Sequence, residues 1–277
     1  MVRHREPRAA PRGGQPPAHR RRAAAARHVL AGLEEVTHSL RSRRRHATAL
    51  PVASPGWLVD LVFPPRCVAC GASAPVLCEA CIRSLRSPGP PSCDRCGAPT
   101  VWAVAQCREC TGRRLGFASA RAAVTYSRAG RALLSAWKEH GLRRAASLAA
   151  DLVAERVEPP AADVIAYIPP DSDRLLERGH HPAEALARGL GRRWELDVRD
   201  LLTRQGAPRG RQATLGRVAR RANVRGAFRS AGSPPARVLL VDDVYTTGAT
   251  ASAAATALRA AGARRVDVVT FARTVLR

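Results

Sequence analysis

Short apolar stretches alternate with longer amphipathic stretches over the second half of the chain. Runs of apolar residues predict strands, and apolar residues spaced three or four positions apart predict helices. Strands are expected at 122–126, 164–168, 238–241 and 266–271. Helices are expected at 128–139, 142–157, 182–194 and 249–261. Because strands that alternate with helices are joined by crossover connections, the pattern predicts an α/β domain with a mostly parallel sheet.

The first part of the chain has no such pattern. Residues 1–50 hold twelve arginines, three acidic residues and five of the eight histidines, without sustained helical or strand periodicity. A segment of this kind cannot bury enough apolar surface to offset the entropy lost on ordering. We therefore expect a disordered basic arm that is dispensable for folding. Its charge fits either nucleic-acid binding or a solvated tail without function.

Between the arm and the α/β domain, a short apolar run at 56–63 leads into a cysteine-rich region. We expect this run to pack on a neighbouring element. Farther on, residues 203–229 are rich in arginine, glycine and glutamine without a clear period, which is typical of a functional loop. A length of 277 residues accommodates one α/β domain and a smaller module. We place the smaller module at 57–115, after the arm, and the α/β domain at 117–277.

The composition gives a formal net charge of +24, from 46 Lys and Arg against 22 Asp and Glu. This excess favours an acidic partner such as nucleic acid, anionic lipid or a phosphorylated metabolite. Lys138 is the only lysine and alanine is abundant, so GC-rich codon usage explains part of the arginine content and the charge does not select among these partners. No stretch approaches the roughly 18–20 apolar residues of a membrane span, and no apolar signal-peptide core is present, so we expect a cytoplasmic protein without an integral membrane segment.

All eight cysteines lie in C-x-x-C pairs, and the arrangement is duplicated. In a compartment that keeps thiols reduced, such pairs indicate metal thiolates rather than disulfides. Two C-x-x-C turns complete one tetrahedral site, and the duplication favours two sequential sites. The first site comprises Cys67, Cys70, Cys78 and Cys81, and the second comprises Cys93, Cys96, Cys107 and Cys110. A closed Cys₄ site has no open coordination position, so we expect two structural zinc ions, with iron–sulfur ligation as the alternative.

The run from Val238 to Thr250 carries the most specific chemistry in the sequence. Its apolar start predicts a buried strand, so Asp242 and Asp243 should emerge at the carboxyl end, where open α/β sheets bind their ligands. The turn that follows can bind a phosphate through backbone N–H groups, hydroxyls and a helix N-terminus. It comprises Thr246, Thr247, Gly248, Ala249 and Thr250. Adjacent acids can bind neighbouring hydroxyls and Mg²⁺, so the run predicts a sugar-phosphate site.

This run resembles the PRPP-binding signature of phosphoribosyltransferases, which consists of a strand, two acids and a T-T-G-x-T loop. Further motifs narrow the resemblance to the ComF family of competence-associated proteins, over residues 57–273. These motifs are the four C-x-x-C pairs, Trp137-Lys138-x-x-Gly141, Ile168-Pro169-Pro170-x-x-x-Arg174-x-x-x-Arg178-Gly179 and Arg220-x-x-Asn223-x-x-Gly226-Ala227-Phe228. The family combines an N-terminal double zinc ribbon with a domain of the type I phosphoribosyltransferase fold.

The resemblance implies that PRPP or a ribose 5-phosphate is the ligand, with Mg²⁺ bound alongside it. Asp242 and Asp243 would hold the ribose and the metal, while Arg174 and Arg178 would neutralise the departing pyrophosphate. The 203–229 segment resembles the mobile loop that closes over PRPP. After Arg-Gly the family has an aromatic residue and Asn-Gln, whereas this chain has His180-His181-Pro182. The two histidines are either acid–base groups or polar surface residues.

The sequence leaves three functions of different classes open. The first is an enzyme that transfers the phosphoribosyl group of PRPP to an acceptor that no motif identifies. The second, implied by the family resemblance, is a non-catalytic accessory factor in DNA uptake that binds single-stranded DNA or the uptake machinery. A third is a zinc-ribbon nucleic-acid binder whose sheet domain is only a scaffold. The sequence indicates no oligomeric state.

Overall fold

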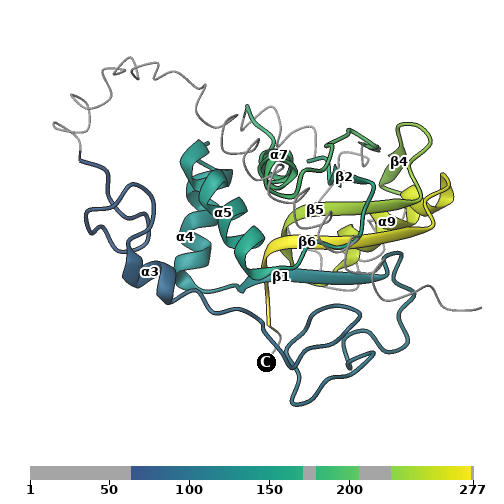
Figure 1. The fold of residues 1–277 in the computed structure, drawn as a ribbon, viewed down its shortest axis with the longest axis horizontal. Coiled ribbons are helices and arrows are strands. Elements are labelled where there is room, and N and C mark those ends of the chain that lie inside the picture. Colours follow the sequence, from purple (N-terminus) through teal and green to yellow (C-terminus); the bar gives the residue numbers. More distant parts are fainter. Residues whose placement is uncertain (1–63, 171–178, 206–225, 276–277) are drawn as a thin grey trace, which may run out of the picture. The chain divides into compact units, whose positions relative to one another are not determined.

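The computed structural model describes residues 64–170, 179–205 and 226–275 (Figure 1). Their central element is a four-stranded sheet in the order β1-β6-β5-β2, with every neighbouring pair parallel. The strands are β1 (Ser119–Thr125), β2 (Val164–Tyr167), β5 (Arg237–Tyr245) and β6 (Arg265–Arg273). The predicted parallel α/β architecture is therefore confirmed.

Helices cover both faces of this sheet. The four helices are α4 (Arg128–Lys138), α5 (Arg143–Arg156), α7 (Pro182–Trp194) and α9 (Ala249–Ala260). Buried residues of α4, α5 and α7 share one hydrophobic cluster with Leu239, Val241 and Phe271. The apolar side of α9 belongs to a second cluster with Val238, Leu240 and Val268. The alternation of β5 residues between the two clusters follows from the period of two along a strand.

Four elements differ from the sequence-based expectation. Strand β5 continues through the two acids to Tyr245, because its ladder with β6 pairs Asp242 with Thr270 and Tyr245 with Arg273. The ends of the 203–229 segment form an antiparallel pair, β3 (Leu202–Arg204) with β4 (Phe228–Ser230), and residues 206–225 lie outside the described part. A five-residue helix, α3 (Glu79–Arg83), lies in the cysteine-rich region.

The cysteine-rich region takes part in both hydrophobic clusters. Cys67, Val76 and Leu77 of the first cysteine group are buried in the cluster that contains α4 and α5. Cys93, Cys96 and Cys110 of the second group are buried in the cluster that contains α9. The two cysteine groups are thus packed against opposite faces of the sheet domain. In the described residues, no helix is both long enough and apolar enough to cross a membrane.

Candidate phosphate site and metal centres

The carboxyl ends of β2 and β5 form a topological switch point. The chain leaves β2 toward α7 on one face of the sheet and leaves β5 toward α9 on the other, so the two connections diverge between neighbouring strands (Figure 1). Ligands of open α/β sheets bind in the crevice that such divergence creates. Asp242, Asp243 and residues 246–250 all lie at this end of β5.

The two acids leave β5 on opposite faces and have different partners. Asp243 forms an ion pair with Lys138, the last residue of α4, with 2.5 Å between Oδ2 and Nζ. Both side chains are largely buried, at 15% and 23% exposure. Lys138 was part of a sequence motif to which no role was assigned. The available signal was that it is the only lysine among 46 basic residues.

Asp242 lies on the α9 side, where it lines a small cavity of about 20 Å³ together with Thr246, Gly248 and Thr250. Its Oδ1 accepts a hydrogen bond of 2.9 Å from the backbone N–H of Asp243. Burial, and secondly the charge of Asp243, raise the pKa of Asp242 to about 8. Burial therefore disfavours the charged form of Asp242, whereas the carboxylate of Asp243 faces Lys138. A cation that binds both carboxylates must displace the proton of Asp242.

Three successive carbonyl groups at the start of the turn after β5, those of Tyr245, Thr246 and Thr247, each accept a hydrogen bond. Thr274 donates to the carbonyl of Tyr245 through its backbone N–H (2.9 Å) and to that of Thr246 through its hydroxyl (3.4 Å). Arg113 donates to the carbonyl of Thr247 through Nη2, at 2.7 Å. In a trans peptide the N–H points opposite to the carbonyl, so the N–H groups of residues 246–248 point away from these donors. In the described part of the chain, none of the three has an acceptor.

Gly248 connects this turn to α9. It is the N-cap residue and has a φ of +69°, as predicted for a glycine that must enter the left-handed region. A Cβ at this position would overlap the phenol ring of Tyr245. Tyr245 is buried, and burial raises its pKa, so it remains a neutral phenol. Gly248 has no side chain to cap α9, and the N–H of Ala249 donates to the Thr247 hydroxyl at 3.4 Å. The positive end of the α9 dipole lies at this turn, where it favours an anion.

The segment that follows β2 contributes two histidines with structural partners. His180 donates from Nε2 to the carbonyl of Trp137 on α4, at 2.9 Å. His181 is the N-cap of α7, where Nδ1 accepts from the N–H of Glu184 at 3.2 Å. Its ring lies edge-on to Tyr167, with 4.9 Å between ring centroids. Burial lowers the pKa of His181, which matches the neutral form required of this acceptor.

These contacts explain the departure from the ComF pattern. His181 stands where the family has asparagine, and asparagine is itself a preferred N-cap residue. Both histidines are half-buried, so neither is the exposed polar residue that was one alternative. Arg174, Arg178 and the arginines expected in the mobile loop lie outside the described residues.

The cysteine sulfurs form two groups, and the pairing is the sequential one predicted from the duplication. Within each group all four Sγ atoms lie within 4.8 Å of one another. Individual Sγ···Sγ distances are 3.6 Å for Cys70–Cys78, 3.6 Å for Cys96–Cys107 and 3.9 Å for Cys93–Cys110. A tetrahedral zinc ion with Zn–S bonds of about 2.3 Å requires about 3.8 Å between sulfurs. The two groups therefore fit one zinc ion each, and they leave no room for several irons and bridging sulfides.

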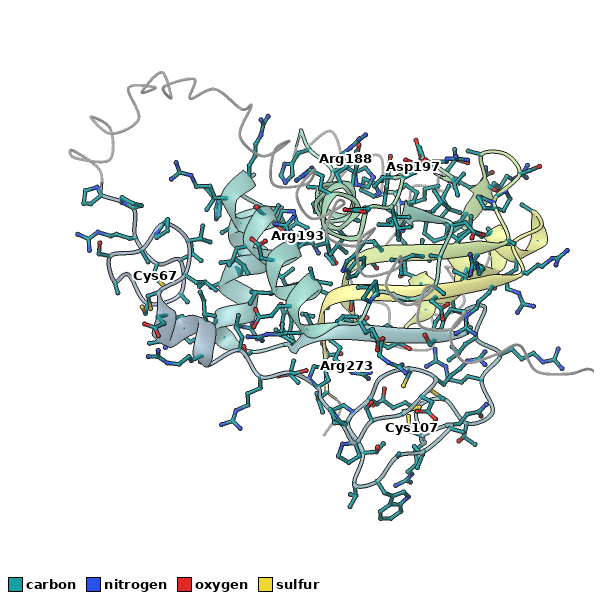
Figure 2. All side chains as sticks on the ribbon, in the orientation of Figure 1. Cys67, Cys107, Arg188, Arg193, Asp197 and Arg273 are labelled. Atoms are coloured by element: carbon teal, nitrogen blue, oxygen red, sulfur yellow. The ribbon has the colours of Figure 1, made fainter. Side chains whose placement is uncertain are left out.

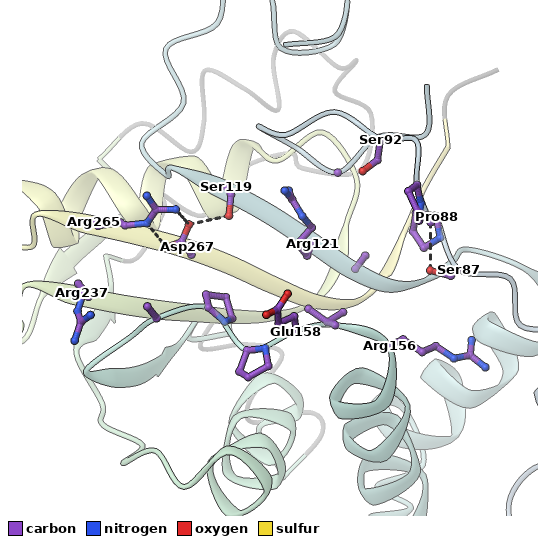
Figure 3. A pocket seen from close by; sticks show the side chains of 18 residues that line it. Ser87, Pro88, Ser92, Ser119, Arg121, Arg156, Glu158, Arg237, Arg265 and Asp267 are labelled. Atoms are coloured by element: carbon purple, nitrogen blue, oxygen red, sulfur yellow. Dashed lines mark hydrogen bonds and ion pairs between the residues drawn. The ribbon is translucent and has the colours of Figure 1, made fainter. Parts of the chain in front are cut away.

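A larger cavity lies at the other end of the sheet. It has a volume of about 610 Å³ and is bordered by Arg121, Arg156, Arg237 and Arg265, together with Glu158 and Asp267 (Figure 3). Arg265 is paired with Asp267 at 2.6 Å, and Arg237 is paired with Asp163 at 2.5 Å. This cavity contains none of the residues that the sequence predicted for the ligand.

Comparisons with known proteins agree with this arrangement. Residues 58–111 match the double zinc ribbon domain family. Competence protein ComFC of Streptococcus pneumoniae is 28% identical over 204 residues, which cover 70% of this chain and 86% of that protein. The motif resemblance noted in the sequence thus has a counterpart in a full-length relative.

Two solved structures of phosphoribosyl enzymes are similar to this chain with lower sequence identity and over a smaller part of its length. The glutamine PRPP amidotransferase of B. subtilis, complexed with ADP and GMP, has a TM-score of 0.34 and 22% identity, over 47% of this chain and 26% of that one. This chain therefore spans about a quarter of the amidotransferase. Adenine phosphoribosyltransferase of Leishmania tarentolae has a TM-score of 0.21 and 15% identity, over 46% and 71% of the two chains. The chain thus has two four-cysteine groups within a region that matches the double zinc ribbon family, followed by a parallel α/β sheet, and over 70% of its length it is similar to competence protein ComFC.

Proposed function

We propose that this protein binds PRPP or a ribose 5-phosphate at the carboxyl end of β5. The 5′-phosphate is bound by the 246–250 segment, and the ribose hydroxyls and Mg²⁺ are bound by Asp242 and Asp243. The observation that carries the proposal is the orientation of three successive N–H groups, at residues 246–248, beside the N-terminus of α9. Such an array binds phosphate oxygens with backbone donors alone.

The acid pair adds selectivity for a sugar phosphate over a bare phosphate. Carboxylate oxygens accept hydrogen bonds from neighbouring hydroxyls and are ligands that Mg²⁺ prefers. Mg²⁺ supplies charge neutralisation for the pyrophosphate of PRPP. Lys138 holds Asp243 through their ion pair, and its ammonium would be available to a ligand oxygen if Asp243 held a cation instead.

We further propose that the site transfers the phosphoribosyl group. The nucleophile of the acceptor attacks C1 of the ribose, the C1–oxygen bond to pyrophosphate breaks, and pyrophosphate leaves with the electron pair. The acceptor loses a proton to the medium or to a nearby base. Catalysis of this displacement is mainly positioning and charge stabilisation, for which Arg174 and Arg178 are the proposed partners of pyrophosphate.

Calorimetry with Mg²⁺ present tests the binding step. The ligands are PRPP, ribose 5-phosphate and inorganic phosphate. Replacement of Asp242 and Asp243 together by Asn is expected to weaken PRPP more than inorganic phosphate, whereas Gly248→Val weakens both. Absence of PRPP and ribose 5-phosphate binding at millimolar concentrations, or an unchanged affinity in the double variant, contradicts the proposal. Pyrophosphate release across a panel of bases and amines tests the transfer step separately.

The similarity to a competence protein supports a second candidate function. In this alternative the protein is a non-catalytic accessory factor in DNA uptake and binds single-stranded DNA. The net charge of +24 would supply contacts to the phosphate backbone, so binding must weaken steeply with salt. Fluorescence anisotropy with a labelled oligonucleotide at several salt concentrations measures this. Affinity that is independent of salt, or undetectable at low salt, excludes this function.

A further inference from the structure

Arg113 joins the second cysteine group to the candidate phosphate site. It lies three positions after Cys110, and its guanidinium contacts two backbone carbonyls that are far apart in sequence. Nη1 donates to the carbonyl of Glu109 at 3.1 Å, and Nη2 donates to that of Thr247 at 2.7 Å. Arg113 thereby fixes the plane of the peptide between Thr247 and Gly248. The direction of the Gly248 N–H, one of the three donors of the candidate site, depends on this contact.

Arg273 forms a second connection between the same two parts (Figure 2). Its side chain is 1% exposed. Nη1 donates to the carbonyl of Cys96 at 2.5 Å, and Nη2 donates to the Glu109 carboxylate at 3.3 Å. The guanidinium also lies over the ring of Tyr245, 5.1 Å from its centroid. That ring packs against Gly248. The turns that carry Cys96 and Glu109 are therefore joined to the 246–250 segment through Arg273 and Tyr245.

The chain that leaves the second cysteine group also contacts the start of α9. The N–H of Gly116 donates to the hydroxyl of Ser252 at 3.0 Å. A Cβ at Gly116 would lie 2.5 Å from the backbone oxygen of Ser252, so the two backbones are in direct contact. Phe117 packs edge-on against Tyr245, with 6.2 Å between ring centroids.

The first cysteine group has no comparable connection. It packs against α4 and α5, and in the described residues no hydrogen bond joins it to the 246–250 segment. The next hydrogen bonds along the chain link Leu85 to Arg156 and Arg86 to Thr125, both away from this segment. The two metal centres therefore differ in what they support.

From these contacts we propose that Arg113 is a positioning residue for the phosphate-binding N–H groups. Metal loading of the second cysteine group, but not of the first, then raises the affinity of the 246–250 segment for phosphate. This proposal rests on the proposed function of that segment. The metal fixes the two turns that carry Cys96 and Glu109, and these turns hold Arg273 and Arg113. Because coupling between two binding equilibria is reciprocal, phosphate must in turn retain the metal of the second group.

Substitution of Arg113 tests the positioning role in the full-length zinc-loaded protein. Arg113→Ala is expected to lower the affinity for inorganic phosphate and for ribose 5-phosphate about tenfold, the effect of losing one charge-assisted hydrogen bond. Arg113→Lys, which keeps a cationic donor, is expected to restore part of the loss. Arg121→Ala is the matched control, because Arg121 also donates to a carbonyl in the second cysteine region, that of Asp94 at 2.8 Å, but lies on β1 away from the segment. Equal effects of Arg113→Ala and Arg121→Ala would overturn the proposal, as would loss of zinc from Arg113→Ala.

Hydrogen exchange gives a readout that does not require any ligand. The amides that hydrogen-bond to the carbonyls of this turn are those of Thr274, to Tyr245, and Ser252, to Gly248. In Cys107→Ser these two amides are expected to exchange at least tenfold faster than in the unsubstituted protein, whereas in Cys70→Ser they are expected to be unchanged. Equal exchange in the two cysteine variants overturns the proposal even if phosphate binds. If phosphate does not bind the unsubstituted protein, the proposed function fails, and the exchange result still decides whether the second group positions the segment.

Zinc release tests the reciprocal effect. A chelating dye is added to the unsubstituted protein with and without saturating inorganic phosphate, and the release of each zinc is followed. Phosphate is expected to slow the release of one zinc several-fold and to leave the other unchanged. The slowed zinc must be absent from Cys107→Ser and present in Cys70→Ser. Release that phosphate does not alter, or that it slows equally at both centres, contradicts the coupling.

Discussion

Lys138 and Asp243 form an ion pair across the carboxyl end of the sheet, with 2.5 Å between Nζ and Oδ2. The pair joins the last residue of α4 to β5, and Asp243 lies next to Asp242 in sequence. Without the ammonium, the Asp243 carboxylate would lose its ion-pair partner while it stays next to a second acid in sequence. The high pKa of Asp242, to which burial contributes most, reflects the cost of placing a second charge there.

Removal of Lys138 is therefore expected to destabilise the fold. Lys138→Met keeps the apolar stem but leaves Asp243 without its partner, for an expected loss of about 1–3 kcal/mol in the free energy of unfolding. Urea denaturation at pH 7 measures the loss. Asp243→Asn introduced into Lys138→Met should recover most of it, because the uncompensated charge is then absent. Additive effects of the two substitutions would show that the pair is not coupled.

Gly248→Ala is expected to lower the stability of the fold more than the same substitution at another glycine with a similar positive φ. The left-handed conformation costs any L-residue about 1–2 kcal/mol, and overlap with the Tyr245 ring adds a further loss of about 1–3 kcal/mol. Gly226→Ala is the matched control, since Gly226 has a φ of +78° and no atom within 4 Å of the added Cβ. Thermal unfolding of the two variants compares them. Equal shifts in Tm would mean that the Tyr245 contact has no influence.

The sequence predicted those features of the molecule that depend on local pattern. Helix α7 begins and ends where expected, because Pro182 suits the first helical position and the apolar period is regular. The pairing of the cysteines followed from their duplication. Strand β5 was expected to end before Asp242, because charged residues interrupt the apolar run. Its hydrogen-bonded ladder continues beside β6, and the apolar pattern carries no information about that pairing.

Long-range contacts of the candidate site could not be predicted. Arg113 and Thr247 are 134 positions apart, and one arginine among many has no signal that identifies its acceptor. The same is true of Lys138 and Asp243, although the only lysine of the chain was noticeable. Strands β3 and β4 have three residues each, which is too short for alternation to be recognised. These features depend on how elements pack, which a single sequence does not encode locally.

Two zinc ions per chain are expected in metal-replete protein, one in each cysteine group. Elemental analysis of protein prepared without added iron measures the content. Cys70→Ser and Cys107→Ser should each reduce the zinc content by about one, because a tetrahedral site with three thiolates binds the ion more weakly. Iron in place of zinc, or an absorption spectrum typical of iron–sulfur clusters, would contradict this prediction.

Residues 1–50 are expected to be dispensable for folding, since their composition lacks a core-forming pattern. A chain that begins at Val52 should have the same Tm as the full-length protein when zinc is present in both. Thermal unfolding followed by circular dichroism measures this. A decrease of several degrees would mean that the arm packs on the rest of the protein.

His181 is expected to make stability depend on pH below neutrality. Burial lowers its pKa in the folded protein, whereas in the unfolded chain it takes up a proton near its ordinary pKa of 6.5. The unfolded state therefore binds more protons as the pH falls through 6.5, and the free energy of unfolding decreases, by at most about 1.4 kcal/mol per pH unit. The contribution of the neutral His181 side chain to the free energy of unfolding is fully present above pH 7.5 and is lost progressively toward pH 5.

His181→Asn separates this titration from the capping role of the side chain. Asparagine can accept the hydrogen bond from Glu184 N–H but does not titrate, so the variant should keep most of the stability at pH 7.5. Between pH 7.5 and 5.5 it should lose less stability than the unsubstituted protein, as measured by urea denaturation at each pH. His140→Asn is the matched control, because His140 is exposed. If His181→Asn and the unsubstituted protein have parallel pH profiles, His181 is not the group that links folding to protonation.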